Sequence, residues 1–229
     1  MDISERLKLI ASFVKTSRTI ADIGTDHGYI PIYLVKNGAV DSAIACDINK
    51  EPVRRAKNNV SMNHLSERIE TRLGNGLTPV MKGETDGFVI AGMGGMLMVE
   101  ILSRDKEKTC AAKELVLSPQ SDLDAVRHFL HDNGFKITDE EMLFEDGIYY
   151  TVMRAEHGEE VYNNEAEYLF GRINIEKKST VLKACLEHIM DKNNSVMEKL
   201  RKAATENSLG RLKEIEHYNS ICQEAYKCL

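Results

Sequence analysis

Residues 19–28 read TIADIGTDHG, and the organisation of the chain can be worked out from this stretch. Thr19 to Ile23 is a short, mostly apolar run typical of a buried strand, and Gly24 ends it with a residue that lets the backbone turn sharply. Apolar residues then recur at helical spacing from Ile30 to Val35. A strand, a glycine turn and a helix in this order are typical of a sheet whose parallel strands are linked by helices.

The same alternation continues along the chain. Apolar runs predict further strands over 42–46, 68–73, 87–91 and 115–117, with helices over 51–63 and 122–133. Two more strand-like runs, 135–138 and 147–153, have no long helix between them, so we expect an antiparallel pair that closes the sheet. The pattern predicts an α/β fold with a mostly parallel seven-stranded sheet covered by helices on both faces.

Both ends of the chain carry helical patterns. Asp2 and Glu5 resemble a capping box before an amphipathic helix. An apolar stripe over 181–203 is interrupted at 207–210 and resumes over 212–225, which predicts two antiparallel helices joined by a turn, like a short coiled coil. We therefore expect a nucleotide-binding catalytic domain over 1–158 and a helical domain over 159–229.

Composition limits the class of protein. A chain of 229 residues has room for one α/β domain and a small appendage, and its net charge of −6 argues against a uniformly basic nucleic-acid-binding surface while leaving local basic patches open. The five cysteines show no CxxC spacing, so we predict neither a disulfide framework nor a metal site. No apolar run approaches the ~20 residues of a membrane span, and we expect a cytoplasmic protein.

The turn after the first strand favours a cationic ligand. A dinucleotide fingerprint has glycines as GxGxxG and cradles a pyrophosphate, whereas here the acidic Asp22 and Asp26 would repel one. S-adenosylmethionine carries a cationic amino group and a sulfonium but no phosphate, so it suits this turn. An ordinary strand-to-helix turn would explain the glycines equally well.

Polar groups follow the next two strands. Asp47 comes close to the ~20-residue spacing from the first glycine at which a carboxylate meets a ribose diol, although it could instead cap the next helix. Asn75, in Gly74-Asn75-Gly76, can donate to and accept from an adenine ring, although a simple turn also explains this run.

Glycines crowd the end of the fourth strand. Gly92, Gly94 and Gly95 each carry an entropic penalty, which a flat ring needing room beside the backbone would explain. Pro119 and Gln120 follow the fifth strand, and ligands of such sheets bind at the carboxyl edge.

Six motifs together resemble a known family. DIGTDHGYIP, the acidic end of IACDIN, GNGL, VIAGMGG, LSPQSD and EDGIYY occur in the order found in the bacterial family that methylates N1 of adenine 22 in tRNA. The resemblance covers most of residues 1–155 and implies a Rossmann-like class I methyltransferase fold with S-adenosylmethionine as cofactor and tRNA as partner. The usual family motifs read DIGSDHAYLP and LQPN, from which this chain departs at Thr25, Gly28, Ile30, Ser118 and Gln120.

The resemblance also implies roles for the residues at the sheet edge. Neutral adenine N1 attacks the methyl group without prior loss of a proton, so positioning and electrostatics do most of the work. The implied catalytic residues are Asp26, His27 and Tyr29, of which His27 could instead be a structural histidine and Tyr29 a core residue. The expected cofactor contacts are Asp22, Gly24, Thr25, Asp26, His27, Asp47, Ile48, Asn75, Gly76, Ala91, Gly92 and Met93, and the expected substrate contacts are Arg6, Gly94, Gly95, Pro119 and Gln120.

Recognition of the RNA and assembly stay open at this level. Candidate phosphate contacts, each of which could instead be part of a solvated helix face, are Arg6, Lys50, Arg54, Arg55, Lys57, Lys177, Lys178 and Lys183. The helical hairpin could bind tRNA or pair with another protomer, and we expect a monomer or weak dimer. Two other functions fit the same fold: a methyltransferase for small molecules or proteins, and a non-catalytic RNA-binding module.

Overall fold

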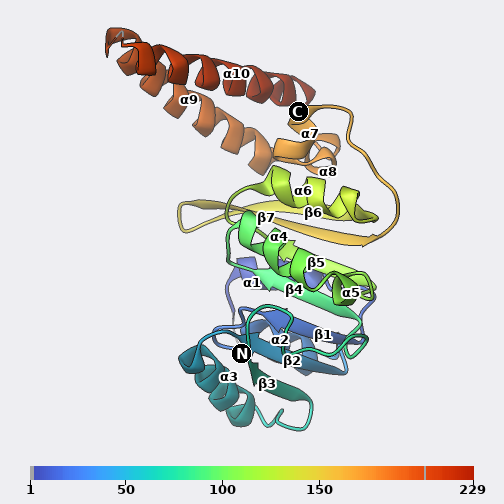
Figure 1. The fold of residues 1–229 in the computed structure, drawn as a ribbon. Helices are drawn as coiled ribbons and strands as arrows, with labels where there is room; N and C mark the ends of the chain where they lie inside the picture. Colours follow the sequence, from blue (N-terminus) through green and yellow to red (C-terminus); the bar gives the residue numbers. More distant parts are fainter. Residues whose placement is uncertain (1–2, 204) are drawn as a thin grey trace. The chain divides into compact units, whose positions relative to one another are not determined.

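The computed structural model, which describes residues 3–203 and 205–229, contains a seven-stranded sheet in the order β3-β2-β1-β4-β5-β7-β6 (Figure 1). Neighbouring strands from β3 to β5 run parallel, and β7 runs antiparallel to β5. The strands are β1 (Thr19–Ile23), β2 (Ser42–Asp47), β3 (Ile69–Leu73), β4 (Gly87–Ala91), β5 (Glu114–Ser118), β6 (Phe135–Glu145) and β7 (Ile148–His157). The predicted mostly parallel sheet is confirmed.

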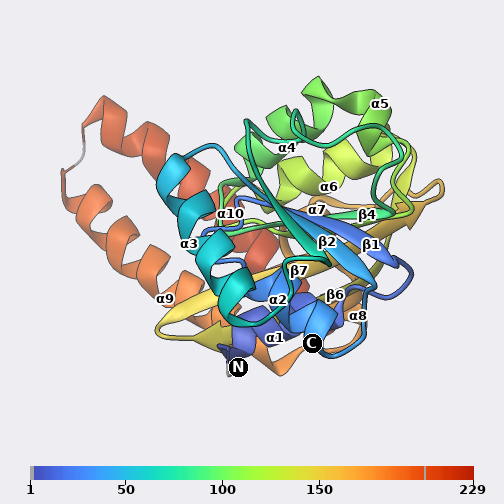
Figure 2. The ribbon, with the colours of Figure 1, turned by 90° about the horizontal axis from the view of Figure 1, so that it is seen from below.

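Helices cover both faces of this sheet. Figure 2 shows α1, α2 and α3 on one face and α4, α5 and α6 on the other. Their bounds are α1 (Glu5–Ser12), α2 (Tyr29–Lys36), α3 (Lys50–Met62), α4 (Gly95–Arg104), α5 (Lys106–Thr109) and α6 (Leu123–Asp132). A large apolar core lies between the first three helices and the sheet, where Ile32, Val89 and Val116 are almost fully buried. This burial fixes the strands whose ends form the site described below.

The closing hairpin is longer than the sequence predicted. β6 and β7 continue to a two-residue turn at Asp146 and Gly147, whose φ angles of 51° and 81° both lie in the left-handed region. This is the geometry of a type I′ turn, which suits the twist of two antiparallel strands. The prediction stopped at residue 138 because β6 places a charged residue, Glu140, in a fully buried position, where it pairs with Arg127 of α6 at 2.6 Å.

The described residues divide into two compact units. One contains residues up to 140 together with 150–161, and the other contains 141–149 and 162–229. The second unit joins the hairpin tip to the helices α7 (Glu165–Phe170), α8 (Arg172–Glu176), α9 (Thr180–Ala203) and α10 (Glu206–Cys228). In its core Met142 of the hairpin packs with Leu182, Leu186 and Cys222. The boundary expected after residue 158 stays a prediction.

The N-terminal ends of α1 and α10 differ from those expected from the sequence. The turn predicted at 207–210 is wrong, since these residues lie within α10. Thr205 caps this helix, and its side chain and that of Ser208 each accept a backbone N–H of the other residue. A glycine inside a helix costs only about 1 kcal/mol, which the packing of a long hairpin tolerates. At the other end Asp2 lies outside the described residues, and Ser4 caps α1 by accepting the N–H of Leu7 at 3.3 Å.

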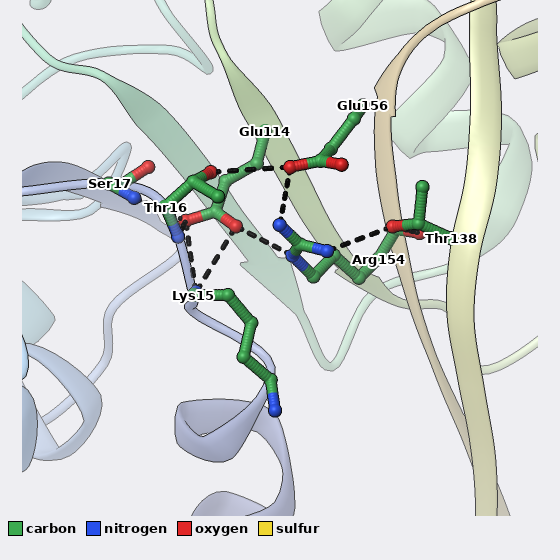
Figure 3. A network of polar contacts seen from close by, with 7 residues as sticks. All are labelled: Lys15, Thr16, Ser17, Glu114, Thr138, Arg154 and Glu156. Carbon is green, nitrogen blue, oxygen red and sulfur yellow. Dashed lines mark hydrogen bonds and ion pairs between the residues drawn. The ribbon is translucent and has the colours of Figure 1, made fainter.

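A buried carboxylate ties the exit of α1 to the sheet. The Glu114 side chain, at the start of β5, is 1% exposed and accepts the backbone N–H groups of Lys15, Thr16 and Ser17. Arg154 of β7 donates to the same carboxylate at 2.8 Å (Figure 3). Burial acts to raise the pKa of Glu114, but the hydrogen bonds from Arg154, Ser17 and Lys15 outweigh it and hold that pKa below its ordinary value. Glu114 is therefore ionised in the folded protein.

Replacing this carboxylate should destabilise the fold. We predict that Glu114→Gln lowers the free energy of unfolding by on the order of 3 kcal/mol, because it leaves the Arg154 charge buried without its partner. Since the folded pKa of Glu114 is depressed, its contribution is present above the unfolded pKa and is lost as the pH falls through the folded pKa. Urea unfolding at pH 7 and at pH 4 measures both effects. Glu107→Gln, which breaks an exposed ion pair with Lys82, is the matched control and should change stability by less than about 1 kcal/mol.

Candidate active site

The ends of the parallel strands meet at one edge of the sheet. β1 places Ile23 beside Cys46 of β2 and Ile90 of β4. The N–H groups of Gly24 and Thr25 both donate to the Cys46 carbonyl, at 2.8 and 2.9 Å. Asp47 therefore follows directly beside the glycine turn, as the predicted site requires.

The remaining loops are tied to the same edge by their backbones. The Gly74 N–H donates to the Asp47 carbonyl at 2.9 Å, which holds the loop after β3 against β2. The Gly92 N–H donates to Ser118 at 3.2 Å, and the Gln120 N–H donates to Met93 at 3.0 Å. The loops after β4 and β5 therefore form one connected rim with the turn after β1.

A cavity of about 330 Å³ opens at this rim. Its lining combines residues of α1, the turn after β1 and the loops after β4 and β5. The lining residues are Arg6, Leu7, Asp22, Gly24, Thr25, Asp26, His27, Tyr29, Ile30, Ala91, Gly92 and Gln120. Ten of these twelve belong to the predicted site, and the sequence analysis missed only Leu7 and Ile30.

Asp22 is the buried acid of the cavity. Its residue is 3% exposed, and its carboxylate accepts the Thr25 hydroxyl at 2.6 Å. Burial raises the pKa of Asp22 to about 7, the Thr25 hydrogen bond opposes this rise, and the nearby Asp47 adds to it. A cation bound here would restore the carboxylate charge, whereas an anion would meet a second negative group.

Asp26 is held from two sides at the mouth of the cavity. Its carboxylate pairs with the Arg55 guanidinium of α3 at 2.5 Å, and His27 Nε2 lies 3.4 Å from the other carboxylate oxygen. The His27 ring stacks on the Tyr29 ring with centroids 5.0 Å apart and planes 9° from parallel. Asn59 of α3 donates to the His27 carbonyl at 2.9 Å, so α3 fixes the whole turn.

Two glycines keep the backbone of the cavity bare. Gly24 and Gly92 have φ angles of 79° and 78°, a left-handed conformation that residues other than glycine adopt at a cost. A Cβ at Gly24 would lie 2.9 Å from the Met93 methyl group, so Met93 packs over this turn. The glycines of the predicted cofactor site therefore have a conformational reason as well as a steric one.

Other predicted cofactor residues lie at the same sheet edge but outside the cavity lining. Asp47 accepts the Asn49 N–H at 2.8 Å, and the N-cap of α3 is Asn49, so Asp47 is not the helix cap considered from the sequence. Ile48 is 59% exposed although it is apolar. Asn75 is exposed, and Gly76 lies against Arg104, which donates to the Asn75 carbonyl at 3.0 Å.

Comparison with known proteins identifies the family. A methyltransferase domain model matches residues 3–153. The tRNA (adenine(22)-N(1))-methyltransferase of Bacillus subtilis is 33% identical over 98% of this chain and 97% of its own length. The chain belongs to this methyltransferase family.

Solved structures agree with this assignment. The B. subtilis M1A22 tRNA methyltransferase TrmK superposes with a TM-score of 0.89 over 98% of this chain and 99% of that one, at 33% identity. Sp1610 of Streptococcus pneumoniae, in complex with S-adenosyl-L-methionine, superposes with a TM-score of 0.84 over 98% and 100% of the two chains, at 32% identity. The similarity to these structures therefore extends over both units of this chain, whereas the methyltransferase domain model ends at residue 153.

Three predicted substrate contacts of this methyltransferase lie outside the cavity lining. Gly95, the first residue of α4, is buried, and a Cβ there would lie 2.5 Å from the backbone oxygens of Ser121 and Asp122. Gly94 faces the Ser121 hydroxyl instead, and Pro119 is buried. Close packing of α4 on the loop after β5 thus explains Gly95, and its assignment to substrate binding stays a prediction.

Several candidate phosphate contacts of the methyltransferase already have acidic or aromatic partners. Arg55 pairs with Asp26, and Arg54 pairs with Glu51 at 2.6 Å. In the second unit Lys177 lies 3.8 Å from Glu141, and the Lys183 ammonium lies 5.2 Å from the centroid of the Tyr226 ring. The sequence showed these cations but not their partners, which come from other elements or from the helix turn beside them.

Within the described part of the methyltransferase, no cluster of three or more histidine, cysteine or acidic side chains could hold a metal ion. Its described helices include none that is long and apolar enough to cross a membrane.

The packing role of Gly95 is testable. We predict that Gly95→Ala lowers the free energy of unfolding by roughly 1–3 kcal/mol, because the added methyl group collides with two backbone carbonyls that cannot rotate away. Gly94→Ala is the matched control, since its φ of −63° suits alanine and the nearest atom is a serine hydroxyl 3.1 Å away. Thermal unfolding of the two variants beside the wild type measures the difference. Equal midpoints would contradict the packing explanation.

Proposed function

We propose that this chain transfers the methyl group of S-adenosylmethionine to N1 of adenine 22 in tRNA, and that it acts in the cytoplasm, where its RNA substrate would be. The single observation that carries the proposal is the cavity at the carboxyl edge, which combines a buried acid, two left-handed glycines and an aromatic rim in a member of this family. The reaction is inferred from the relatives, and the groups that line the cavity fit that reaction.

The residues at the rim fit the methyl donor. Asp22 offers a buried carboxylate to the cationic amino group, and Gly24 leaves the backbone open for a close approach. Asp47 lies at the position that binds a ribose diol in this type of sheet, and the exposed Ile48 and the neighbouring Asn75 would cover the adenine ring. When bound, S-adenosylmethionine supplies a methyl group on a positively charged sulfur.

The chain's own residues position the target base and respond to its charge. Adenine N1 is neutral before the transfer and cationic afterwards, so no general base is needed before attack. Asp26 would accept from the exocyclic amine or stabilise the positive ring, with Arg55 and His27 holding its carboxylate in place. Tyr29, which is 36% exposed and stacked on His27, would form a wall of the base pocket.

The RNA must present a base that is not paired on its Watson–Crick edge. N1 lies on that edge, so adenine 22 has to leave its stack before it can enter the cavity. We assign the rest of tRNA binding to surfaces outside the cavity, including the helices of the second unit. Assembly as a monomer or weak dimer stays a prediction.

Methyl transfer to defined RNA tests the proposed function. The protein is incubated with labelled S-adenosylmethionine and an unmodified tRNA transcript that carries adenine 22, and the product is digested and analysed by mass spectrometry. We expect 1-methyladenosine and a reverse-transcription stop at position 22. A transcript with guanine at position 22 is the control and should accept no label.

Other outcomes would point to the competing functions. Labelling of proteins or small metabolites, without labelling of tRNA, would replace the RNA substrate by another methyl acceptor. Binding of tRNA without calorimetric heat from S-adenosylmethionine or S-adenosylhomocysteine would indicate a non-catalytic RNA-binding module. Either outcome overturns the proposal.

The affinity for the cofactor should depend on pH through Asp22. The raised pKa means that the free protein holds a proton on Asp22 below about pH 7. This protonation stabilises the folded state below the pKa of Asp22 in the unfolded chain, and the stabilisation is lost as the pH rises through 7. A bound cation reverses this preference and expels the proton. We predict that the affinity falls by up to about tenfold per pH unit below 7 and that binding at pH 6 releases protons.

Calorimetry in two buffers of different ionisation enthalpy measures this proton release. Asp22→Asn is the matched variant, because it keeps the side-chain shape without the charge. Its affinity should be weaker at pH 8 and should vary less between pH 6 and pH 8 than that of the wild type. An identical pH profile in both proteins would remove Asp22 from the contact with the cation.

Asp47 and Asp26 should separate binding from turnover. We predict that Asp47→Asn raises the dissociation constant of S-adenosylmethionine by roughly 10–100-fold, because a carboxylate that accepts from two hydroxyls is worth about 1.5–3 kcal/mol. Asp26→Asn should mainly lower kcat, since its carboxylate faces the mouth of the cavity. Calorimetry and single-turnover methylation distinguish the two effects. A variant of Asp26 with unchanged turnover would exclude its role in the reaction.

A further inference from the structure

Arg6 is placed over the bare floor of the cavity by an aromatic ring that the proposed function has not used. Its guanidinium carbon lies 4.9 Å from the centroid of the Tyr150 ring, within cation–π range. A Cβ at Gly92 would lie 3.8 Å from Nη1 of the same guanidinium. Arg6 therefore lies between the Tyr150 ring and the glycine loop after β4.

Tyr150 reaches this edge because β7 runs against the other strands. Leu117, near the end of β5, pairs with Met153, so the residues before Met153 continue past the end of β5. The beginning of β7 thus lies where the parallel strands end. An antiparallel strand can in this way contribute to the carboxyl edge, which its parallel neighbours reach only with their last residues.

α1 and β7, which carry Arg6 and Tyr150, are joined a second time at the opposite edge of the sheet. The segment after α1 donates its backbone N–H groups to Glu114, which also binds Arg154 of β7 (Figure 3). α1 and β7 are therefore connected at one end by Glu114 and Arg154 and at the other by Arg6 and Tyr150. This arrangement gives the guanidinium of Arg6 a defined position on a rigid support.

The chemistry of the reaction indicates what Arg6 binds. Methylation at N1 makes the adenine ring positive, so a guanidinium directly beside that ring would raise the energy of the product and of the transition state. An anionic group of the substrate is therefore better placed against this guanidinium than the ring itself. A swung-out nucleotide brings its backbone phosphates to the mouth of the pocket, and arginine binds phosphate oxygens with two parallel N–H groups.

We infer that Tyr150 is a positioning residue that holds Arg6 over Gly92, where Arg6 binds a backbone phosphate next to the methylated adenine. The inference rests on the proposed function for the identity of the RNA. Tyr150 acts through Arg6 and touches neither the methyl donor nor the reacting atoms. Its ring supplies the contact, so its hydroxyl group is dispensable.

A double-mutant cycle tests the inference. The proteins are the wild type, Tyr150→Phe, Tyr150→Leu, Arg6→Gln and the double variant Arg6→Gln/Tyr150→Leu. We expect Tyr150→Leu to raise KM for tRNA by about 2–5-fold, as the loss of a cation–π contact of about 0.5–1 kcal/mol implies, with kcat less affected. Tyr150→Phe should match the wild type, and the dissociation constant of S-adenosylmethionine should be unchanged in both.

The Arg6→Gln background shows whether the ring acts through Arg6. There, Tyr150→Leu should raise KM by less than twofold further. Arg6→Gln should also reduce the slope of log(kcat/KM) against log salt by about one, which is the signature of one lost phosphate contact. Circular dichroism and thermal unfolding establish that each variant is folded, and a Tyr150→Leu protein that fails to fold is replaced by Tyr150→Val in the same cycle.

Three results would overturn the inference. Equal effects of Tyr150→Leu with and without Arg6 would mean that the ring acts independently of Arg6. A Tyr150→Phe variant as weak as Tyr150→Leu would assign the role to the hydroxyl group. An unchanged salt slope in Arg6→Gln would exclude the phosphate. Failure of the proposed function is distinguishable from these results, because the wild type would then transfer no methyl group to tRNA. In that case the same cycle, measured by fluorescence anisotropy of tRNA binding, still reports the coupling between Arg6 and Tyr150.

Discussion

The parallel register of β1, β2 and β4 is the constraint on which the site depends. Because Ile23 lies beside Cys46 and Ile90, the residues that follow these strands emerge next to one another. Two N–H groups of the first turn then bind the carbonyl of Cys46, and this leaves Gly24 against Asp47. A shift of one residue in either pairing would turn Asp22 or Asp47 to the other face of the sheet, and the two carboxylates would no longer share one edge.

Burial gives this edge its chemical preference. Asp22 loses hydration inside the fold, and its carboxylate accepts from the neutral hydroxyl of Thr25, which compensates the buried charge only in part. Asp26 differs from Asp22, because it is exposed and paired with Arg55. The buried charge of Asp22 in β1 is thus compensated only in part, whereas Asp26 in the turn after it is paired with a cation. This difference supports the proposal that Asp22 binds the methyl donor and that Asp26 faces the RNA.

The sequence predicted the frame of the site because that frame depends on local patterns. β1 and β4 have the predicted bounds, because each is an apolar run that is followed directly by a glycine, Gly24 after β1 and Gly92 after β4. The acids and glycines at the strand ends were predictable for the same reason, because topology alone brings strand ends together. Ten of the twelve residues that line the cavity were among the predicted site residues, although Arg6 and Tyr29 entered that set only through the family resemblance.

Contacts between distant elements were beyond the reach of local patterns. Arg55 was one of several basic residues on a helix, and nothing in its surroundings indicated that it pairs with Asp26. Gly95 counted as room for a base, although the backbone of Ser121 and Asp122 already fills that space. Glu140 hid the length of β6 because its buried charge is matched by Arg127 of α6. Each of these cases needs a partner whose position only the folded chain determines.

The ion pairs of the first unit bear on how a net acidic protein would bind the proposed RNA substrate. Most cations of the first unit are bound to acids of the same unit, as with Arg54 and Glu51 or Arg72 and Glu84. Such pairs add little to long-range attraction, since their fields largely cancel beyond a Debye length. Under the proposed function, recognition would then depend on a few cations fixed at defined places rather than on a broad basic surface. An aromatic ring beside an arginine suits this purpose, because it orients the planar guanidinium.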